Sequence, residues 1–209
     1  MRAAVLGGSF DPPHLGHEHI AVEAAEQLNL QRLYLVPAHR SPFKSGHGAR
    51  GFRRMEMLER SASAIKRRVP ELQIKILDVE LKRGGSSYSY QTLEYISREL
   101  SGENHDYTNS ELYLIIGEDN LKTFTLWKQW KNILELARLA VLPRETGRGR
   151  ISLPEDLEHV KERIRIVNAP VFPAASSSIR EMIARGDNTD TVLNKEVYEY
   201  IRDNSLYSI

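Results

Sequence analysis

The chain has 209 residues and 41% hydrophobic residues, enough for one ordinary domain with a real core. Lys and Arg number 29 against 28 Asp and Glu, so the chain is nearly neutral. This balance excludes a strongly basic, histone-like protein that binds polyanions through its net charge. Without cysteine there are no disulfides or cysteine metal ligands, and no export signal or 18-residue apolar run is present, so we expect a cytoplasmic protein with a single domain over residues 1–209.

Six short runs rich in aliphatic and β-branched residues are typical of strands buried on both faces. They span residues 3–6, 33–36, 74–77, 112–116, 139–142 and 164–167. Between them, apolar residues recur at helical spacing over 20–28, 55–69 and 93–100. This alternation predicts an α/β fold, a Rossmann-like doubly wound parallel sheet of five or six strands with flanking helices. Ligands of such sheets bind beyond the carboxyl ends of the strands, where strand order reverses.

The segment 171–209 differs from the rest of the chain. A serine run at 176–178 precedes helical patterns at 179–184 and 195–202, which predicts a small C-terminal helical part. Gly, Pro, Ser and charged residues predict the least ordered stretches, which are residues 39–51, 102–110 and 145–154.

The stretch after the first predicted strand is the most informative. Residues 7–17 are Gly-Gly-Ser-Phe-Asp-Pro-Pro-His-Leu-Gly-His, and an amphipathic helix begins at once. The leading glycines let backbone approach a ligand closely, and a helix N-terminus attracts an anion such as phosphate. His14 and His17 lie three apart with Gly16 between them, so we expect both rings on one side of the first turn, donating to the same phosphate group.

The histidine pair has two other interpretations. Both residues can be ordinary solvated side chains at a helix start, but the spacing His-x-Gly-His directly after the first strand favours a functional site. A metal site is the sharper alternative. It fits poorly, because no third carboxylate or histidine stands nearby at ligand spacing.

The motif resembles the signature of the HxGH nucleotidyltransferase superfamily, and its longer form, with Phe-Asp-Pro-Pro-His, is similar to that of bacterial nicotinate-nucleotide adenylyltransferases. The resemblance implies that AMP passes from ATP to nicotinate mononucleotide, with release of pyrophosphate, in NAD biosynthesis. Later motifs extend the resemblance along almost the whole chain.

The loop after the second predicted strand contains His-Arg-Ser-Pro-Phe-Lys, residues 39–44. It resembles the family's loop ending in Pro-Pro-His-Lys, with Phe43 in place of the histidine. The resemblance implies that Lys44 reaches the ATP phosphates, while a solvated basic loop remains the alternative for Lys44 and Arg40. Arg54, in a helix that resembles the family's Arg-x-x-Met-Leu pattern, has either a structural or a substrate-orienting role.

Residues 82–93 follow the third predicted strand and resemble the family's Arg-x-Gly-x-Ser-Tyr-Thr-x-Asp-Thr-Leu segment, with Gln91 where Asp is most frequent. The resemblance implies that Ser89 hydrogen-bonds the nicotinate carboxylate and that Ser87 and Tyr88 belong to the same site. From the residues alone, Ser87 and Ser89 suit equally well as N-caps of the next helix.

The fourth predicted strand runs into Ile-Gly-Glu-Asp-Asn-Leu, residues 116–121, which match the family's Ile-Gly-x-Asp-x-Leu. Gly117 permits close approach of a nucleotide, and a carboxylate at a strand end can accept hydrogen bonds from ribose hydroxyls. The resemblance implies that Asp119 faces the nucleotide, that Trp127 stacks on the nicotinate ring, and that the neighbouring Lys128 belongs to the same substrate site.

Arg144, just past the fifth predicted strand, matches a family arginine that approaches phosphate. The sequence Ala-Ser-Ser-Ser-Ile-Arg that begins at Ala175 resembles the family's Ile-Ser-Ser-Thr-x-Ile-Arg, with alanine in place of its first serine. The resemblance implies that Ser176 and Ser177 cap a helix and present hydroxyl and N–H groups to the β- and γ-phosphates. Arg180 adds positive charge from the first turn.

These motifs together imply direct in-line transfer, with Mg²⁺ bridging the ATP phosphates and no metal held by the protein. The expected catalytic residues are His14, His17, Lys44 and Arg180. Those expected to bind ATP are Gly7, Gly8, Ser9, Phe10, Gly16, Gly117, Asp119, Arg144, Ser176 and Ser177. Those expected to bind nicotinate mononucleotide are Ser87, Tyr88, Ser89, Trp127 and Lys128.

Three alternatives to this function remain. One is another adenylyltransferase of the superfamily, acting on phosphopantetheine or nicotinamide mononucleotide, and a second is a nucleotide-binding regulator without turnover. The third, a nucleic-acid-binding module, is suggested by residues 31–83, which carry 13 Lys and Arg against 5 Asp and Glu, but such a stretch is more often a solvated face. We therefore expect ATP and nicotinate mononucleotide as partners, no nucleic acid and no membrane, and leave a homo-oligomer open.

Overall fold

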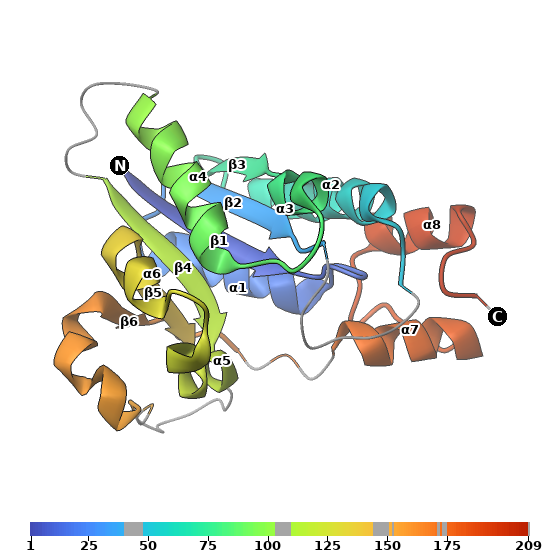
Figure 1. Cartoon of the computed structure of the whole chain (residues 1–209). Coiled ribbons are helices and arrows are strands. Elements are labelled where there is room, and N and C mark those ends of the chain that lie inside the picture. The colour runs from blue at the N-terminus through green and yellow to red at the C-terminus, as the bar shows by residue number, and fades with distance from the viewer. Residues whose placement is uncertain are drawn as a thin grey trace.

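The computed structural model describes residues 1–39, 48–102, 110–143, 151, 153–170, 172 and 175–208. In these residues six parallel strands form one sheet in the order β3-β2-β1-β4-β5-β6 (Figure 1). The strands are β1 (Arg2–Gly8), β2 (Arg32–Pro37), β3 (Gln73–Ile76), β4 (Glu111–Gly117), β5 (Arg138–Leu142) and β6 (Ile164–Ile166). The prediction of a parallel sheet of five or six strands is confirmed, with six.

The strand order reverses at the centre of the sheet. From β1 the chain steps outward through β2 and β3, and it then returns to the other side of β1 with β4, β5 and β6. Leu6 pairs with Ile115, and Gly8 pairs with Pro37, so the ends of β1, β2 and β4 lie at one edge. In open α/β sheets a ligand binds at this edge, between the two strands where the order reverses.

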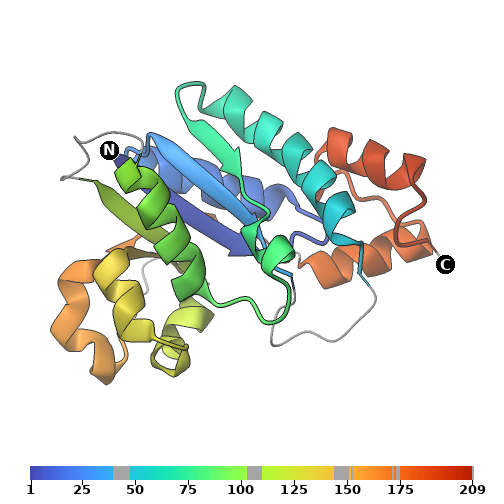
Figure 2. The same ribbon diagram turned by 45° about the horizontal axis from the view of Figure 1, so that its top comes forward.

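Helices cover both faces of the sheet. They are α1 (Leu15–Gln27), α2 (Gly51–Arg68), α3 (Val79–Arg83), α4 (Ser89–Gly102), α5 (Glu118–Lys122), α6 (Trp130–Leu136), α7 (Ser176–Arg185) and α8 (Lys195–Asp203), with 3-10 segments η2 (Phe124–Leu126) and η3 (Glu155–Arg163). Figure 2 shows α4 and α6 in front of the sheet and α1 behind it. The five helices expected from apolar spacing are all present. The stretches expected to be least ordered lie largely outside the described residues.

Alternation along the strands builds two separate cores, because successive side chains of a strand point to opposite faces. In β1, Ala3 and Val5 pack with residues of α4 and α6, whereas Ala4 and Leu6 pack with residues of α1 and α2. All four side chains are buried. Burial on both faces is why the strands appear in the sequence as continuous apolar runs rather than alternating ones.

The C-terminal helices form a third cluster of their own against α2. Ile179 of α7 and Val197 and Ile201 of α8 pack with the fully buried Met57 of α2. Figure 1 places α7 and α8 beyond the end of β1, and α8 beside α2. The expected C-terminal helical part is therefore present at the edge where the strands end. That residues 1–209 form a single domain stays a prediction.

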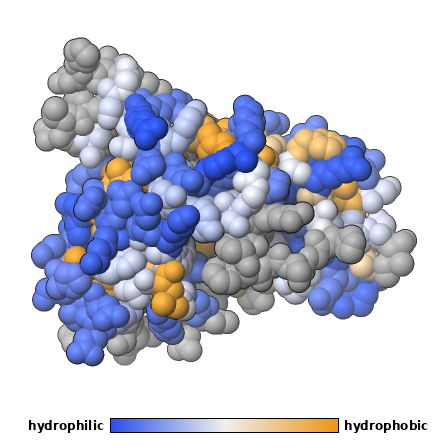
Figure 3. Space-filling view, in the orientation of Figure 1, coloured by the Kyte–Doolittle hydropathy of each residue, from blue (hydrophilic) through white to orange (hydrophobic). Residues whose placement is uncertain are grey.

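On the face shown in Figure 3, hydrophobic side chains are scattered among hydrophilic ones. Large hydrophobic side chains that are exposed in the described residues come from separate elements, and they are Phe52, Tyr95, Leu126, Ile166 and Tyr198. No helix in the described ranges is long and apolar enough to cross a membrane. Formation of a homo-oligomer stays a prediction.

Glu18 of α1 gives a stability prediction. Burial raises the pKa of its carboxyl above the ordinary value of 4.5, against the opposing effect of hydrogen bonds from the Ser61 hydroxyl, at 2.8 Å, and the Asn194 side chain. Since the folded-state pKa is the higher one, the ionised carboxylate lowers the free energy of unfolding as pH rises through the interval between the two values.

We expect Glu18→Gln, which keeps an oxygen for both hydrogen bonds, to raise the thermal midpoint at pH 8. The gain shrinks toward zero near pH 4, where the unaltered carboxyl is protonated in both states. For a domain of this size each kcal/mol corresponds to about 2–4 °C. Thermal unfolding across this pH range measures the effect, with Glu26→Gln, at an exposed position of the same helix, as control. A gain independent of pH would contradict the assignment.

Candidate active site

The backbone changes direction directly after β1. Phe10 takes a left-handed conformation, with φ of 47°, and its ring is fully buried. A Cβ on Gly8 would lie 3.3 Å from the end of that ring, so glycine gives the ring its room. The Phe10 ring in turn lies 4.9 Å from the ring of His17, measured between centroids. The whole residue is buried, backbone included, so Phe10 presents no exposed surface for the expected contact with ATP.

The structure brings His14 and His17 together at the start of α1. Their ring centroids are 3.8 Å apart, with planes inclined by 38°. The backbone N–H of His14 donates to Nδ1 of His17 at 3.2 Å. Since Nδ1 accepts, the proton of a neutral His17 ring is on Nε2, which is the nitrogen that can donate to a ligand.

Gly16 leaves the space that these rings occupy. A Cβ at this position would lie 2.9 Å from Cε1 and Nδ1 of His14 and 2.7 Å from Cδ1 of Phe172. The Phe172 ring stacks on the His14 ring, with centroids 5.5 Å apart and planes within 9° of parallel. Sequence reasoning missed Phe172, because an isolated aromatic residue among prolines and alanines carries no pattern.

Arg54 joins the ends of two strands. Its guanidinium Nη1 donates to the carbonyl oxygens of Ser9, at 2.6 Å, and Ala38, at 2.7 Å, which follow β1 and β2. The residue is buried, and burial lowers its pKa from the usual range of arginine. Of the two roles considered for Arg54, these contacts favour the structural one.

The segment expected to bind phosphate also holds the loop after β1. The Ser176 hydroxyl is buried and donates to the Pro12 carbonyl at 3.0 Å. Nη1 of Arg180 donates to the Asp11 carbonyl at 2.7 Å. Ser177 is exposed at the start of α7. Three residues predicted as phosphate ligands therefore lie beside the loop that joins β1 to α1, residues 9–14, which we call the histidine loop. Two of the three bond to its backbone.

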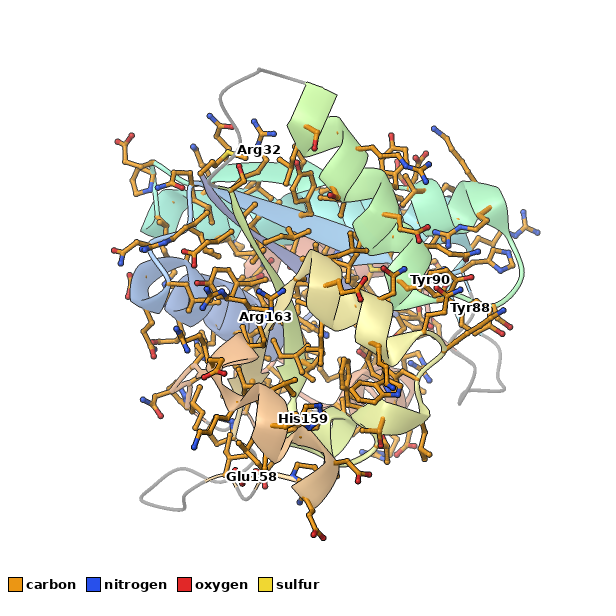
Figure 4. All side chains as sticks on the ribbon, turned by 60° about the vertical axis from the view of Figure 1, so that its left-hand side comes forward. Arg32, Tyr88, Tyr90, Glu158, His159 and Arg163 are labelled. Carbon is orange, nitrogen blue, oxygen red and sulfur yellow. The ribbon has the colours of Figure 1, made fainter. Side chains whose placement is uncertain are left out.

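The residues expected to bind the nicotinate half come from two distant segments. Nζ of Lys128 lies 4.7 Å from the centre of the Tyr88 ring, a cation–π contact that joins them. Trp127 is half-buried and packs on Phe124, with centroids 5.6 Å apart. Figure 4 shows Tyr88 and Tyr90 close together at the start of α4.

Ser87 and Ser89 lie in the same region. The Ser87 hydroxyl accepts a hydrogen bond from the backbone N–H of His39 at 3.1 Å, and Nδ1 of His39 lies 3.1 Å from the Gly85 carbonyl oxygen. Ser89 is the first residue of α4. The end of β2 is thus tied to the loop before α4, with Ser87 in a structural contact.

Gly117 and Asp119 stand at the end of β4. No atom of the described residues lies within 4 Å of a Cβ built on Gly117, so these residues leave open space beside this strand end. Asp119 is exposed in the first turn of α5. Gly7 lies within β1, and its added Cβ would meet only the Val36 carbonyl oxygen, at 4.0 Å. Lys44 and Arg144 lie outside the described residues.

The residues that the structure describes contain no group of three His, Asp or Glu side chains that could hold a metal ion. The donors gathered at the strand ends are instead imidazole, guanidinium, backbone N–H and hydroxyl groups, which suit anionic phosphate oxygens.

Comparison with known proteins gives concordant results. Residues 5–182 match the cytidylyltransferase-like family. The chain is 30% identical, over 99% of its length and the whole of the relative, to a probable nicotinate-nucleotide adenylyltransferase of Shewanella frigidimarina. It is 37% identical to the one from Aquifex aeolicus, over 77% of this chain and 83% of the relative.

Solved structures share the fold. The nicotinic acid mononucleotide adenylyltransferase of Plasmodium falciparum complexed with NaAD has a TM-score of 0.74 at 16% identity, covering 99% of this chain and 97% of that one. The same protein complexed with APC has a TM-score of 0.72 at 18% identity, covering 99% and 96%.

Proposed function

This chain belongs to the cytidylyltransferase-like family, and from that premise we propose that it transfers AMP from ATP to nicotinate mononucleotide, giving nicotinate adenine dinucleotide and pyrophosphate in NAD biosynthesis. Full-length relatives named as probable nicotinate-nucleotide adenylyltransferases support this substrate pair. The observation that carries the proposal is the His14–His17 pair, whose ring centroids lie 3.8 Å apart at the point where strand order reverses.

In the proposed reaction a 5′-phosphate oxygen of nicotinate mononucleotide attacks the α-phosphorus of ATP in line. The new P–O bond forms as the bond to the leaving pyrophosphate breaks, and no covalent enzyme intermediate arises. Such transfer depends on positioning and on stabilising charge at the phosphate oxygens. Nε2–H of His17 is one donor, and His14, Lys44 and Arg180 supply others. Mg²⁺ enters bound to the ATP phosphates, as part of the substrate.

Arg180 can serve the loop and the substrate at once. A guanidinium group has five N–H donors, and only part of this one is needed for the Asp11 carbonyl. The side chain is 32% exposed. Ser176 has its hydroxyl on Pro12, so we propose that it contributes through backbone N–H at the start of α7, together with Ser177.

The acceptor site is proposed to lie around Trp127. Its ring stacks on the nicotinate ring, and Ser89 bonds the carboxylate, with Tyr88 and Lys128 beside them. The contact between Tyr88 and Lys128 supports this grouping, because it joins the loop before α4 to the segment before α6. Gly117 and Asp119, at the end of β4, are proposed to face the nucleotide.

Trp127→Ala is expected to raise the KM for nicotinate mononucleotide about tenfold and to leave the KM for Mg·ATP unchanged. Loss of an aromatic stack costs roughly 0.5–1.5 kcal/mol, and 1.4 kcal/mol is a factor of ten. Steady-state kinetics, with each substrate varied in turn, measures the two KM values separately. Trp127→Phe should recover part of the loss, and Leu126→Ala, at a residue 83% exposed, is the control. Equal rises in both KM values would contradict this placement.

The proposed function is tested by pyrophosphate release from Mg·ATP with three acceptors in parallel: nicotinate mononucleotide, nicotinamide mononucleotide and phosphopantetheine. We expect strong preference for the first. Release with only another acceptor would keep the transfer mechanism and contradict the roles of Trp127 and Ser89. No release with any acceptor would contradict the proposed activity and favour a nucleotide-binding regulator.

A further inference from the structure

Asp11, midway along the histidine loop, is a meeting point of four segments. Its carboxylate Oδ1 accepts hydrogen bonds from the Ala49 backbone N–H at 3.0 Å and from the Tyr207 hydroxyl at 2.6 Å. Nη1 of Arg180 lies 3.8 Å from Oδ2. The Asp11 side chain is only 14% exposed. The loop after β1, the chain before α2, helix α7 and the end of the chain thus converge on one carboxylate.

Tyr207 reaches this point from two residues before the end of the chain. It adopts a left-handed backbone conformation, with φ of 65°, which is uncommon for a bulky residue and costs on the order of 1 kcal/mol or more. Its ring packs against the cluster formed by α2, α7 and α8. Burial and the Asp11 charge raise the pKa of its hydroxyl, which therefore stays protonated and donates.

The contacts leave little freedom in the loop between β1 and α1. Arg54 holds the Ser9 carbonyl, and Arg180 and Ser176 hold the carbonyls of Asp11 and Pro12. These bonds fix the backbone, whereas the Tyr207 hydroxyl fixes the one acidic side chain of the loop. His14 follows Asp11 by three residues and is the N-cap of α1.

We propose that Tyr207 is a positioning residue for the histidine pair: by holding the Asp11 carboxylate it sets the loop that delivers His14 and His17. The turnover part of this inference rests on the proposed function. A hydrophobic ring alone would satisfy the packing of the C-terminal cluster, so the hydroxyl and its 2.6 Å bond are the specific element.

Tyr207→Phe removes only that hydroxyl. We expect kcat to fall about tenfold, the KM for nicotinate mononucleotide to stay the same, and the Cε1–H NMR resonances of the His14 and His17 rings to shift, because small misplacements of catalytic groups cost large factors in rate. Active sites are counted by the binding stoichiometry of nicotinate mononucleotide, so a loss of folded protein is not mistaken for slower turnover. Tyr198→Phe, on the exposed side of α8, is the matched control and should change neither kcat nor the resonances.

A double-variant cycle with Asp11→Ala, which removes the acceptor oxygen, tests the route of the effect. If Tyr207 acts through Asp11, adding Tyr207→Phe to Asp11→Ala lowers kcat by less than twofold. A full tenfold further loss, or Tyr207→Phe with unchanged kcat and unchanged histidine resonances, would overturn the proposal. Should Tyr207→Phe fail to fold, Asp11→Ala must move the same resonances. Absence of turnover in the unaltered protein counts against the proposed function only, since the resonances report positioning without it.

Discussion

Replacing His17 by alanine is expected to lower kcat by on the order of 10²-fold or more while the fold stays intact. Removal of one preorganised donor to developing charge typically has an effect of this size. We expect the donor to be Nε2–H, because Nδ1 accepts the His14 N–H. Pyrophosphate release measures the loss, and circular dichroism and the thermal midpoint check the fold.

Two variants make this test specific. Glutamate at the same position can accept the His14 N–H as in a capping box, yet it has no donor, so His17→Glu should be stable and at least as inactive as His17→Ala. His159→Ala is the histidine control, since His159 is exposed on η3, away from Tyr88 in Figure 4. Near-normal turnover of His17→Ala would remove this residue from the mechanism.

Gly16→Ala is expected to lower kcat by about 10- to 100-fold with the protein still folded. In an ordinary helix this change would stabilise by up to about 1 kcal/mol. Here the new Cβ would lie 2.7 Å from Phe172 and 2.9 Å from the His14 ring, so the rings must turn away. A displacement of about 1 Å in a catalytic group can cost 10²-fold.

A second substitution should show how much of the loss comes from the contact of the new Cβ with Phe172 and how much from its contact with the His14 ring. Gly16→Ala combined with Phe172→Ala lets the His14 ring retreat into the space left by Phe172, so part of the turnover should return. Gly102→Ala, at a position with nothing within 4 Å of the added Cβ, should have no effect on kcat. A fully active Gly16→Ala would show that the His14 ring orientation is unimportant for turnover.

The sheet could be predicted from the sequence because strands buried on both faces leave continuous apolar runs, such as residues 112–116 within β4. The short helices α3, α5 and α6 were missed, since five to seven residues are too few for a periodic pattern. The His14–His17 pair was predicted because its geometry is local to one helical turn.

Contacts between distant parts of the chain could not be predicted, because they produce no pattern in the sequence. The stack of Phe172 on His14 and the bond from Tyr207 to Asp11 join residues more than 150 positions apart. Resemblance indicated that Ser176 and Arg180 matter, but not that both bond to the backbone of the loop after β1. These backbone contacts became visible only with the fold.

The ties between the C-terminal segment and the loop after β1 have a consequence for synthesis. All six strands lie within residues 1–166, so the sheet can form while the last forty or so residues are still in the ribosome. The loop, however, receives Ser176, Arg180 and Tyr207 only from the end of the chain. A nascent chain whose sheet has formed therefore still lacks the contacts that hold this loop, and we expect termination shortly before Tyr207 to lower turnover.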